Sequence, residues 1–301
     1  MSNNTVEINF PKVELKALDN LWFQVSGTLC NIACHHCFIS CSPTNHSFEF
    51  LTFDEVKRSV DESMDIGVKE YYFTGGEPFM NKHLLDMIEY VMEFGPVTVL
   101  SNGMLIKEET AKRLAGIEKN SIYSLEIRIS IDGYTEEMND AIRGQGVFKK
   151  AMQGVQNLFN NGFLPIITVT KTWEESEDEK VLKGFVKLLK SHGYNRPRIK
   201  ILPSIKIGQE KVRTKGYDKY EYVAEEMMEG YEESNLLCSN SRVVTNKGIA
   251  VCPILIEAPD AILGKTLSES MKSCELAHQA CYTCYLYGAI CTNFSSGSGN
   301  E

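Results

Sequence analysis

Predicted strands and helices alternate along most of this chain, and that alternation constrains the fold more than any other feature of the sequence. Helical stretches carry apolar residues at spacings of three and four, as in Val56, Val60 and Met64, and each is followed by a short apolar run. Six such runs are expected to be strands, at residues 21–28, 70–74, 97–100, 125–129, 164–169 and 199–202. Strands that alternate with helices form a parallel sheet covered by helices, so the sequence predicts an α/β fold.

The flanks of this alternating region carry weaker signals. Residues 1–19 are polar and mixed, and we expect a short hairpin or an arm there. Residues 206–216 are basic and indicate a loop, whereas residues 217–231 are acidic and favour a helix. An Asn-Lys-Gly turn within residues 242–251 predicts a β-hairpin. Residues 295–301 have the Gly/Ser composition of a flexible tail.

Composition limits the setting in which the protein works. The 301 residues are 43% hydrophobic, which is enough for one large domain and a small appendage. The net charge of −9 and the lack of a basic cluster argue against nucleic acid as a partner. No apolar run reaches the ~20 residues of a membrane span, and the N-terminus lacks a signal region. We therefore expect a cytoplasmic protein that binds neither nucleic acid nor membrane.

The ten cysteines occur in two groups, four within residues 30–41 and six within residues 238–291. The long stretch between Cys41 and Cys238 contains none. In a reducing compartment, clustered cysteines favour metal ligation over disulfides. The chain is therefore predicted to carry two metal sites on one scaffold.

The first group contains the run Cys30-x3-Cys34-x2-Cys37. Three thiolates can hold three irons of a [4Fe–4S] cluster and leave the fourth iron open to another ligand. The alternative is a zinc site with Cys41 as its fourth ligand. The two histidines inside the run are not expected to bind the same ion, because the loop is too short to turn their rings onto it.

The spacing of these three cysteines resembles the hallmark of the radical S-adenosylmethionine (SAM) enzymes. In that superfamily the open iron takes the amino and carboxylate groups of SAM, and one electron from the cluster cleaves SAM to a 5′-deoxyadenosyl radical. The resemblance implies a partial (β/α)6 TIM-like barrel, open on one side, and an electron donor of the flavodoxin or ferredoxin type. The chain is accordingly expected to divide into an arm, the barrel, a C-terminal auxiliary-cluster domain and a tail, at residues 1–20, 21–205, 206–294 and 295–301.

Polar groups at the strand ends are expected to hold SAM, because functional groups of parallel barrels gather at the carboxyl ends of the strands. Gly75-Gly76-Glu77 matches the GGE motif with which the superfamily binds the SAM amino group. A plain glycine turn is the structural alternative for this stretch. Within the resemblance, however, the motif follows the cysteine loop and lies at a strand end, which favours SAM binding.

Other strand ends carry short polar side chains that can reach the ribose or the carboxylate of SAM. Ser130-x-Asp132 resembles a ribose-side motif, and Arg143 stands where a subfamily places its carboxylate-binding arginine. An Asx turn and a solvated arginine are the structural alternatives. His36 is expected to lie beside the adenine. The full set of candidate SAM-binding residues is His36, Gly75, Gly76, Glu77, Ser101, Asn102, Ser130, Asp132 and Arg143.

The second cysteine group resembles the auxiliary-cluster domains of radical SAM enzymes, named SPASM and twitch. Two cysteines would meet at the base of the predicted hairpin, and a Cys-x2-Cys pair would add two more thiolates. The spacings depart from the SPASM pattern, and six cysteines cannot ligate two clusters. One auxiliary [4Fe–4S] cluster is therefore expected, with zinc in the same site as the alternative; its ligands would be Cys238, Cys252, Cys281 and Cys284. Cys274 and Cys291 are spare, or one of them replaces a ligand.

These motifs allow several functions. We favour hydrogen abstraction followed by oxidation of a small molecule or a residue, with the auxiliary cluster as electron acceptor or substrate ligand. Maturation of a ribosomally made peptide, through a thioether or C–C crosslink, is the alternative; the short segment before the first strand cannot form a peptide-recognition domain. Nucleotide cyclisation is disfavoured because a glycine-rich, arginine-bearing C-terminus is missing. A non-enzymatic iron–sulfur carrier would not need Gly75-Gly76-Glu77, and no catalytic side chain is identified.

Overall fold

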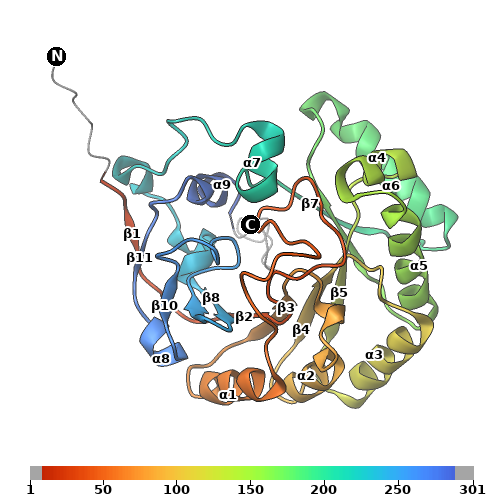
Figure 1. The fold of residues 1–301 in the computed structure, drawn as a ribbon, viewed down its shortest axis with the longest axis horizontal. Helices are drawn as coiled ribbons and strands as arrows, with labels where there is room; N and C mark the ends of the chain where they lie inside the picture. Colours follow the sequence, from red (N-terminus) through yellow and green to blue (C-terminus); the bar gives the residue numbers. More distant parts are fainter. Residues whose placement is uncertain (1–8, 289–301) are drawn as a thin grey trace.

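The computed structural model describes residues 9–288, and its centre is a curved, mostly parallel sheet (Figure 1). Six neighbouring strands pair in parallel, in chain order. They are β2 (Asn20–Gln24), β3 (Glu70–Thr74), β4 (Val97–Ser101), β5 (Leu125–Ser130), β6 (Ile166–Thr170) and β7 (Arg198–Leu202). Each overlaps one of the six strands expected from the sequence, so the predicted α/β fold with a partial six-stranded barrel is confirmed.

Helices cover the outer side of the parallel strands, along the lower and right-hand edges of Figure 1. They are α1 (Phe53–Met64), α2 (Leu84–Val91), α3 (Glu108–Asn120), α4 (Glu136–Arg143), α5 (Val147–Asn160) and α6 (Asp178–Ser191). The first begins at a capping box in which the Thr52 hydroxyl accepts from Glu55 N–H (3.2 Å) and the Glu55 carboxylate accepts from Thr52 N–H (2.7 Å). The short helix α4 was not expected from the sequence.

The two faces of the parallel strands bury different side chains. Alternate residues, such as Leu21, Phe23 and Phe73, pack against the helices in one large apolar cluster. The residues between them point into the curve of the sheet, where Trp22 stacks on Tyr72 with ring centroids 4.2 Å apart. The outer face therefore holds the fold together, and the inner face surrounds the space in which a ligand can bind.

The sheet continues beyond the barrel on the side of β2. Strand β8 (Ser241–Thr245) lies parallel to β2 and antiparallel to β9 (Gly248–Ala250), which pairs with β10 (Ile262–Gly264). The predicted hairpin is confirmed as β8–β9. The complete order of the nine strands is β10-β9-β8-β2-β3-β4-β5-β6-β7, so the C-terminal region extends the barrel's own sheet.

Two expectations for residues 206–231 are wrong. The basic segment forms helix α7 (Gly208–Thr214), in which the buried carboxylate of Glu210 pairs with Arg213 (2.7 Å). The acidic segment contains only a short 3-10 turn at Glu225–Met228. Closely spaced carboxylates disfavour a helix there because they repel one another. Tyr231, at the end of this segment, stacks on Tyr285 of the C-terminal region, with ring centroids 4.4 Å apart.

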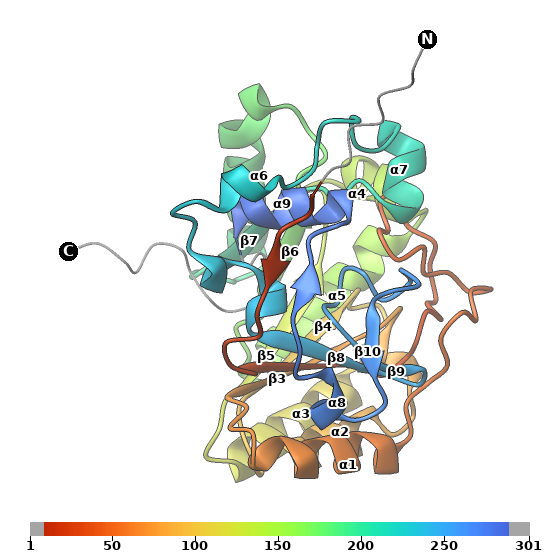
Figure 2. The same ribbon diagram turned by 90° about the vertical axis from the view of Figure 1, so that its left-hand side faces the viewer.

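Residues 9–19 form an arm that reaches the C-terminal region of the described chain. Strand β1 (Lys12–Val13) pairs antiparallel with β11 (Cys274–Glu275), as Figure 2 shows. The remaining helices of the C-terminal region are α8 (Leu267–Ser270) and α9 (Gln279–Tyr287). Within residues 9–288, no helix combines the length and apolarity needed to cross a bilayer. The predicted tail at 295–301 and Cys291 lie outside the described residues.

Candidate functional site

The three cysteines of the first group lie together in the loop between β2 and α1, at the carboxyl ends of the parallel strands. Cys37 N–H donates to the Cys34 carbonyl (3.2 Å), and His35 N–H donates to the carbonyl of Ile142 in α4 (2.9 Å). Cys30, Cys34 and Cys37 all border one cavity of about 200 Å³. The structure therefore brings together the residues that the spacing predicts as ligands.

The three thiols differ in their electrostatic surroundings. Burial raises the pKa of Cys30 to about 11 and that of Cys34 to about 12. The pKa of Cys37 is lowered to about 6, chiefly because its sulfur accepts a hydrogen bond from the Cys41 thiol. Thiols must lose their protons when they bind iron, so iron binding at Cys30 and Cys34 becomes more favourable as the pH rises.

The donor set fits a three-cysteine cluster. Each cysteine of a [4Fe–4S] cluster binds a different iron atom, so the sulfurs surround a shared space instead of converging on a point. Cys30, Cys34 and Cys37 border such a space, and they would leave one iron for another ligand. Within residues 9–288, no three Cys, His, Asp or Glu side chains converge in the way that ligands of a single metal ion do.

Gly75 and Gly76 are required by the packing of the cysteine loop against the end of β3. A Cβ on Gly75 would meet the Ser26 hydroxyl at 2.2 Å, and a Cβ on Gly76 would meet the Leu29 carbonyl at 2.1 Å. Gly75 also has a φ of 148°, which side-chain-bearing residues rarely adopt. Both glycines border the first cavity. The two glycines therefore allow the segments at Ser26 and Leu29 to pack closely against the end of β3.

Glu77 is completely buried and does not border the cavity. Its carboxylate accepts from the Ser101 hydroxyl (2.8 Å), from Asn102 N–H (2.8 Å) and from Phe79 N–H (3.1 Å). Burial raises the pKa of Glu77 to about 7, despite these donors. Ser101 and Asn102 do border the cavity, so Glu77 fixes the end of β4 beside the site.

Asp132 is also completely buried, behind His36 and Arg143. Its Oδ2 lies 2.6 Å from His36 Nε2 and 2.6 Å from Arg143 Nε, and its Oδ1 accepts from Thr170 N–H (2.7 Å). Burial would raise the pKa of Asp132, but Arg143 and His36 hold it well below its usual range. Both carboxylate oxygens of Asp132 are thus engaged by neighbours, and Asp132 does not border the cavity, whereas His36, Arg143 and Ser130 do.

Sequence reasoning missed residues that line the same cavity from other elements. Thr168 and Thr170 project from β6, and Leu202 ends β7. The strand ends could have been found from the periodicity, since alternate residues of a strand share a face. Pro253 comes from the C-terminal region and carries no such signal.

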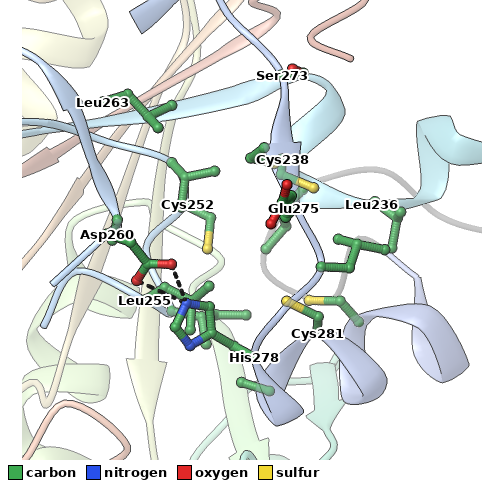
Figure 3. A pocket seen from close by; sticks show the side chains of 18 of the residues that line it. Leu236, Cys238, Cys252, Leu255, Asp260, Leu263, Ser273, Glu275, His278 and Cys281 are labelled. Atoms are coloured by element: carbon green, nitrogen blue, oxygen red, sulfur yellow. Dashed lines mark hydrogen bonds and ion pairs between the residues drawn. The ribbon is translucent and has the colours of Figure 1, made fainter. Parts of the chain in front are cut away.

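The second cysteine group surrounds a separate cavity of about 310 Å³ (Figure 3). Four of its residues were predicted as ligands, and the structure places all four at this cavity. Cys274, which the sequence left spare, lines it too, and its sulfur shares a hydrogen bond with that of Cys238. The five cysteines come from the 3-10 turn Leu237–Ser239, the segment after β9, β11 and two positions of α9: Cys238, Cys252, Cys274, Cys281 and Cys284.

A histidine and a carboxylate stand at the edge of this cavity. His278 Nε2 lies 3.0 Å from both carboxylate oxygens of Asp260, as the dashed lines in Figure 3 show. The backbone carbonyl of His278 accepts from Cys281 N–H (2.9 Å). Burial raises the pKa of Cys281 to about 12, so here too iron binding must displace a proton.

A single segment separates the two cavities. Cys252 borders the second cavity, and its neighbour Pro253 borders the first. Ile254 and Leu255 border the second cavity and also a third hollow of about 350 Å³, which reaches Phe38 of the cysteine loop. Residues 252–255 therefore lie at the boundary between the two cysteine sites.

Comparison with known proteins gives a consistent result. A family model described as the radical SAM superfamily matches residues 25–183, which is more than half of the chain. An AdoMet-dependent heme synthase of Nitratidesulfovibrio vulgaris is 36% identical over 147 residues, which cover 48% of this chain and 38% of that protein. The mycofactocin maturase MftC of Mycobacterium tuberculosis is 36% identical over 135 residues, which cover 44% of this chain and 33% of that protein. The matched part of the chain thus spans only about a third of the length of these curated relatives.

Two solved structures share the fold over most of the chain. SuiB of Streptococcus suis, bound to its precursor peptide SuiA, matches with a TM-score of 0.62 at 15% identity. The match covers 85% of this chain and 65% of the SuiB chain. The protein anSMEcpe, with bound AdoMet, has a TM-score of 0.61 at 17% identity and covers 83% of this chain and 79% of its own. At such identities the likeness establishes the architecture, in agreement with the partial barrel described above.

Proposed function

This chain belongs to the radical SAM superfamily, and from that premise we propose that it oxidises its substrate with the help of an auxiliary iron–sulfur cluster. When bound, a [4Fe–4S] cluster and SAM supply a 5′-deoxyadenosyl radical that takes a hydrogen atom from an unactivated carbon. The observation that carries the proposal is that the sequence neighbours Cys252 and Pro253 border the two different cavities. A substrate in the first cavity would lie next to a group held in the second.

The residues of the first cavity would bind and orient SAM. Asn102 donates through its side-chain amide to Asn31 Oδ1 (2.7 Å), and its backbone is fixed by Glu77, so its position is set on two sides. Arg143 is oriented by Asp132, with its Nη1 4.0 Å from Cys34 Sγ. This places a cation beside the cysteine loop, where it can pair with the SAM carboxylate.

The second cavity offers one more cysteine than a cluster of four irons requires. Cys238, Cys252 and Cys281 would be ligands in either assignment, and Cys284 or Cys274 would complete the set. Cys274 lines this cavity beside Cys238, so it could take the place of Cys284. The fifth thiol would then stand beside the cluster without binding iron.

Two substrate classes remain in competition. A small molecule is our first choice from the sequence, and the similarity to a heme synthase is in keeping with it. A peptide residue is the second. The similarity to a mycofactocin maturase and to a bacteriocin biosynthesis protein of Bacillus subtilis supports the peptide, as do structural neighbours solved with peptides bound. In either case, loss of one hydrogen atom followed by loss of one electron and one proton gives a two-electron oxidation.

The decisive experiment measures cleavage of SAM by the anaerobically reconstituted protein. With dithionite as reductant, 5′-deoxyadenosine should form, and it should not form when Cys30, Cys34 and Cys37 are replaced together by Ala. A protein that holds iron and sulfide yet never cleaves SAM would be a carrier, and the proposal would fail. Transfer of deuterium from labelled candidate substrates into 5′-deoxyadenosine would then separate small molecules from peptides.

A further inference from the structure

Arg242, on strand β8, carries a guanidinium group that is completely buried. All three of its nitrogen atoms donate to backbone carbonyls: Nε to Ser270 (2.9 Å), Nη1 to Cys238 (2.8 Å) and Ser241 (2.7 Å), and Nη2 to Lys272 (2.7 Å). Within residues 9–288, no carboxylate forms an ion pair with Arg242. Its hydrogen bonds are therefore made, but its charge has no counter-ion.

The lack of a carboxylate partner distinguishes Arg242 from the other buried arginines of the described chain. Arg128 Nε lies 2.9 Å from a carboxylate oxygen of Glu126, and Arg143 Nε lies 2.6 Å from one of Asp132. A buried charge is costly unless an opposite charge lies near it, and carbonyl oxygens carry no net charge. The environment of Arg242 thus indicates that an anionic group belongs close by.

The second cysteine site lies next to Arg242. Cys238, whose carbonyl accepts from Nη1, lines the second cavity. Lys272, whose carbonyl accepts from Nη2, directly precedes Ser273 and Cys274, which also line it. The guanidinium therefore joins the turn that carries Cys238 to the strand that carries Cys274. This places a fixed positive charge behind the wall of the cavity.

We propose that Arg242 is a positioning residue of the second site, whose buried charge balances the negative charge of that site and raises its reduction potential. The inference rests on the proposed function, because it requires an iron–sulfur cluster in the second cavity. Four thiolates carry more negative charge than the oxidised core of such a cluster carries positive charge, so the occupied site is anionic. Arg242 supplies the opposite charge that the described residues otherwise lack there.

The direction of the effect follows from the electron balance of the proposed oxidation. The substrate radical loses one electron to the second site and one proton to water, and an oxidised electron carrier of the flavodoxin or ferredoxin type later takes that electron. While the electron is in the second site, the site carries one more negative charge. A cation stabilises this reduced form more than the oxidised form, and burial keeps salt from screening the attraction. Arg242 should therefore make the second site a better electron acceptor.

The experiment measures the reduction potential of the second cluster in the full chain. Cys30, Cys34 and Cys37 are replaced by Ala in every protein, so that EPR in a potentiometric titration reports the second cluster alone. Arg242→Gln keeps hydrogen-bond donors without the charge and should lower the equilibrium constant for one-electron reduction about tenfold, which corresponds to about 59 mV. Arg242→Lys keeps the charge with fewer donors and should stay within about threefold of the parent. Arg58→Gln, which removes an exposed arginine, is the matched control and should change nothing.

Iron content and circular dichroism accompany each titration, and three outcomes would overturn the inference. The first is a parent-like potential in Arg242→Gln at parent-like iron content. The second is an equal fall of the potential in Arg242→Gln and Arg242→Lys, because hydrogen bonds and not charge would then act. The third is loss of iron from both variants, which would make Arg242 a structural tie only. Loss of iron from Arg242→Gln alone would support the inference, since the charge would then be needed to hold the anionic cluster. The proposed function fails on different observations, namely a parent protein that never cleaves SAM or that holds zinc in the second site.

Discussion

The two cysteine sites are assembled in opposite ways. The first is local: Cys30, Cys34 and Cys37 come from one loop, and a few backbone hydrogen bonds define their arrangement. The second gathers cysteines from a 3-10 turn, a hairpin, the strand β11 and the helix α9. Its geometry therefore depends on long-range packing, including the pairing of β11 with the N-terminal arm.

This contrast distinguishes the first site, where the reaction would begin, from the second site, which also supports the structure around it. A local site on the ends of a rigid sheet keeps its shape when a distant segment is disturbed. A site made from scattered segments is disturbed by any of them, and its metal in turn holds those segments together. We therefore expect the first site to keep its shape when the second is lost. The second site should be more sensitive, because damage to any of its surrounding segments disturbs it.

The largest expected effect is on iron content. The reconstituted parent should bind about eight irons as two clusters. Replacing Cys30, Cys34 and Cys37 together by Ala should leave about four, and should leave the circular dichroism spectrum unchanged because the loop lies on a preformed sheet. Stoichiometric zinc in the second site, after preparation with iron and sulfide, would contradict the auxiliary cluster.

Loss of the second site should stop product formation while SAM cleavage continues. The double variant Cys281→Ala and Cys284→Ala should still give 5′-deoxyadenosine with dithionite, since that step needs only the first site. When the variant is given a known, deuterated substrate, deuterium should appear in 5′-deoxyadenosine. Little oxidised product should form. Because a lost metal can unfold a small region, circular dichroism and SAM affinity serve as controls. Product at the parent rate from an intact barrel would reduce the second site to a structural role.

Glu77 of the first site should make the stability of the protein depend on pH. The pKa of Glu77 is about 7 in the folded protein, against 4.5 for an ordinary glutamate. The folded state thus holds this proton more tightly, so the stabilisation is complete below pH 4.5 and is lost as the pH rises through about 7. The free energy of unfolding of the metal-free protein should fall by about 3 kcal/mol across this range, and Glu77→Gln should remove the fall. Urea unfolding at several pH values measures the free energy of unfolding of the parent and of Glu77→Gln. If that free energy depended on pH equally in both proteins, the effect could not be assigned to Glu77.

SAM affinity should respond to Glu77 as well, through the residues that it supports. Glu77→Ala leaves the Ser101 hydroxyl and the Asn102 N–H without their acceptor, and hydrogen bonds to a charged group contribute about 1.5–3 kcal/mol. Binding measured by calorimetry should weaken about tenfold to a hundredfold, with both clusters retained. Glu93→Ala removes an exposed carboxylate and is the matched control. Parent-like affinity in Glu77→Ala would remove Glu77 from the support of the site.

The sequence was informative where a signal is local. The strands β2–β7, the capping box at Thr52 and the hairpin β8–β9 all follow from periodicity or turn chemistry within a few residues. The same holds for the three cysteines of the first loop. Helix α7 was missed because the pairing of buried Glu210 with Arg213 depends on the folded structure, which composition does not record.

The roles of the site residues were harder to predict than their positions. The sequence placed Glu77 and Asp132 at strand ends, but it could not show that both carboxylates would be buried and fully engaged by neighbours. Cys274 looked spare because no regular spacing connects it to Cys238. Only the pairing of β11 with β1 brings Cys274 to the second cavity.

The pairing of β8 with β2, and of β11 with β1, has a consequence for biosynthesis. The ribosome makes β2 early, yet one of its edges stays without a partner until β8 has been made, more than two hundred residues later. The nascent barrel therefore emerges with an exposed strand edge, which is a site for aggregation. Strand β1 of the arm stays unpaired for longer still, because its partner β11 is made after β8. The second cysteine site can therefore close only after residues 274–284 have been made, long after the strands of the barrel.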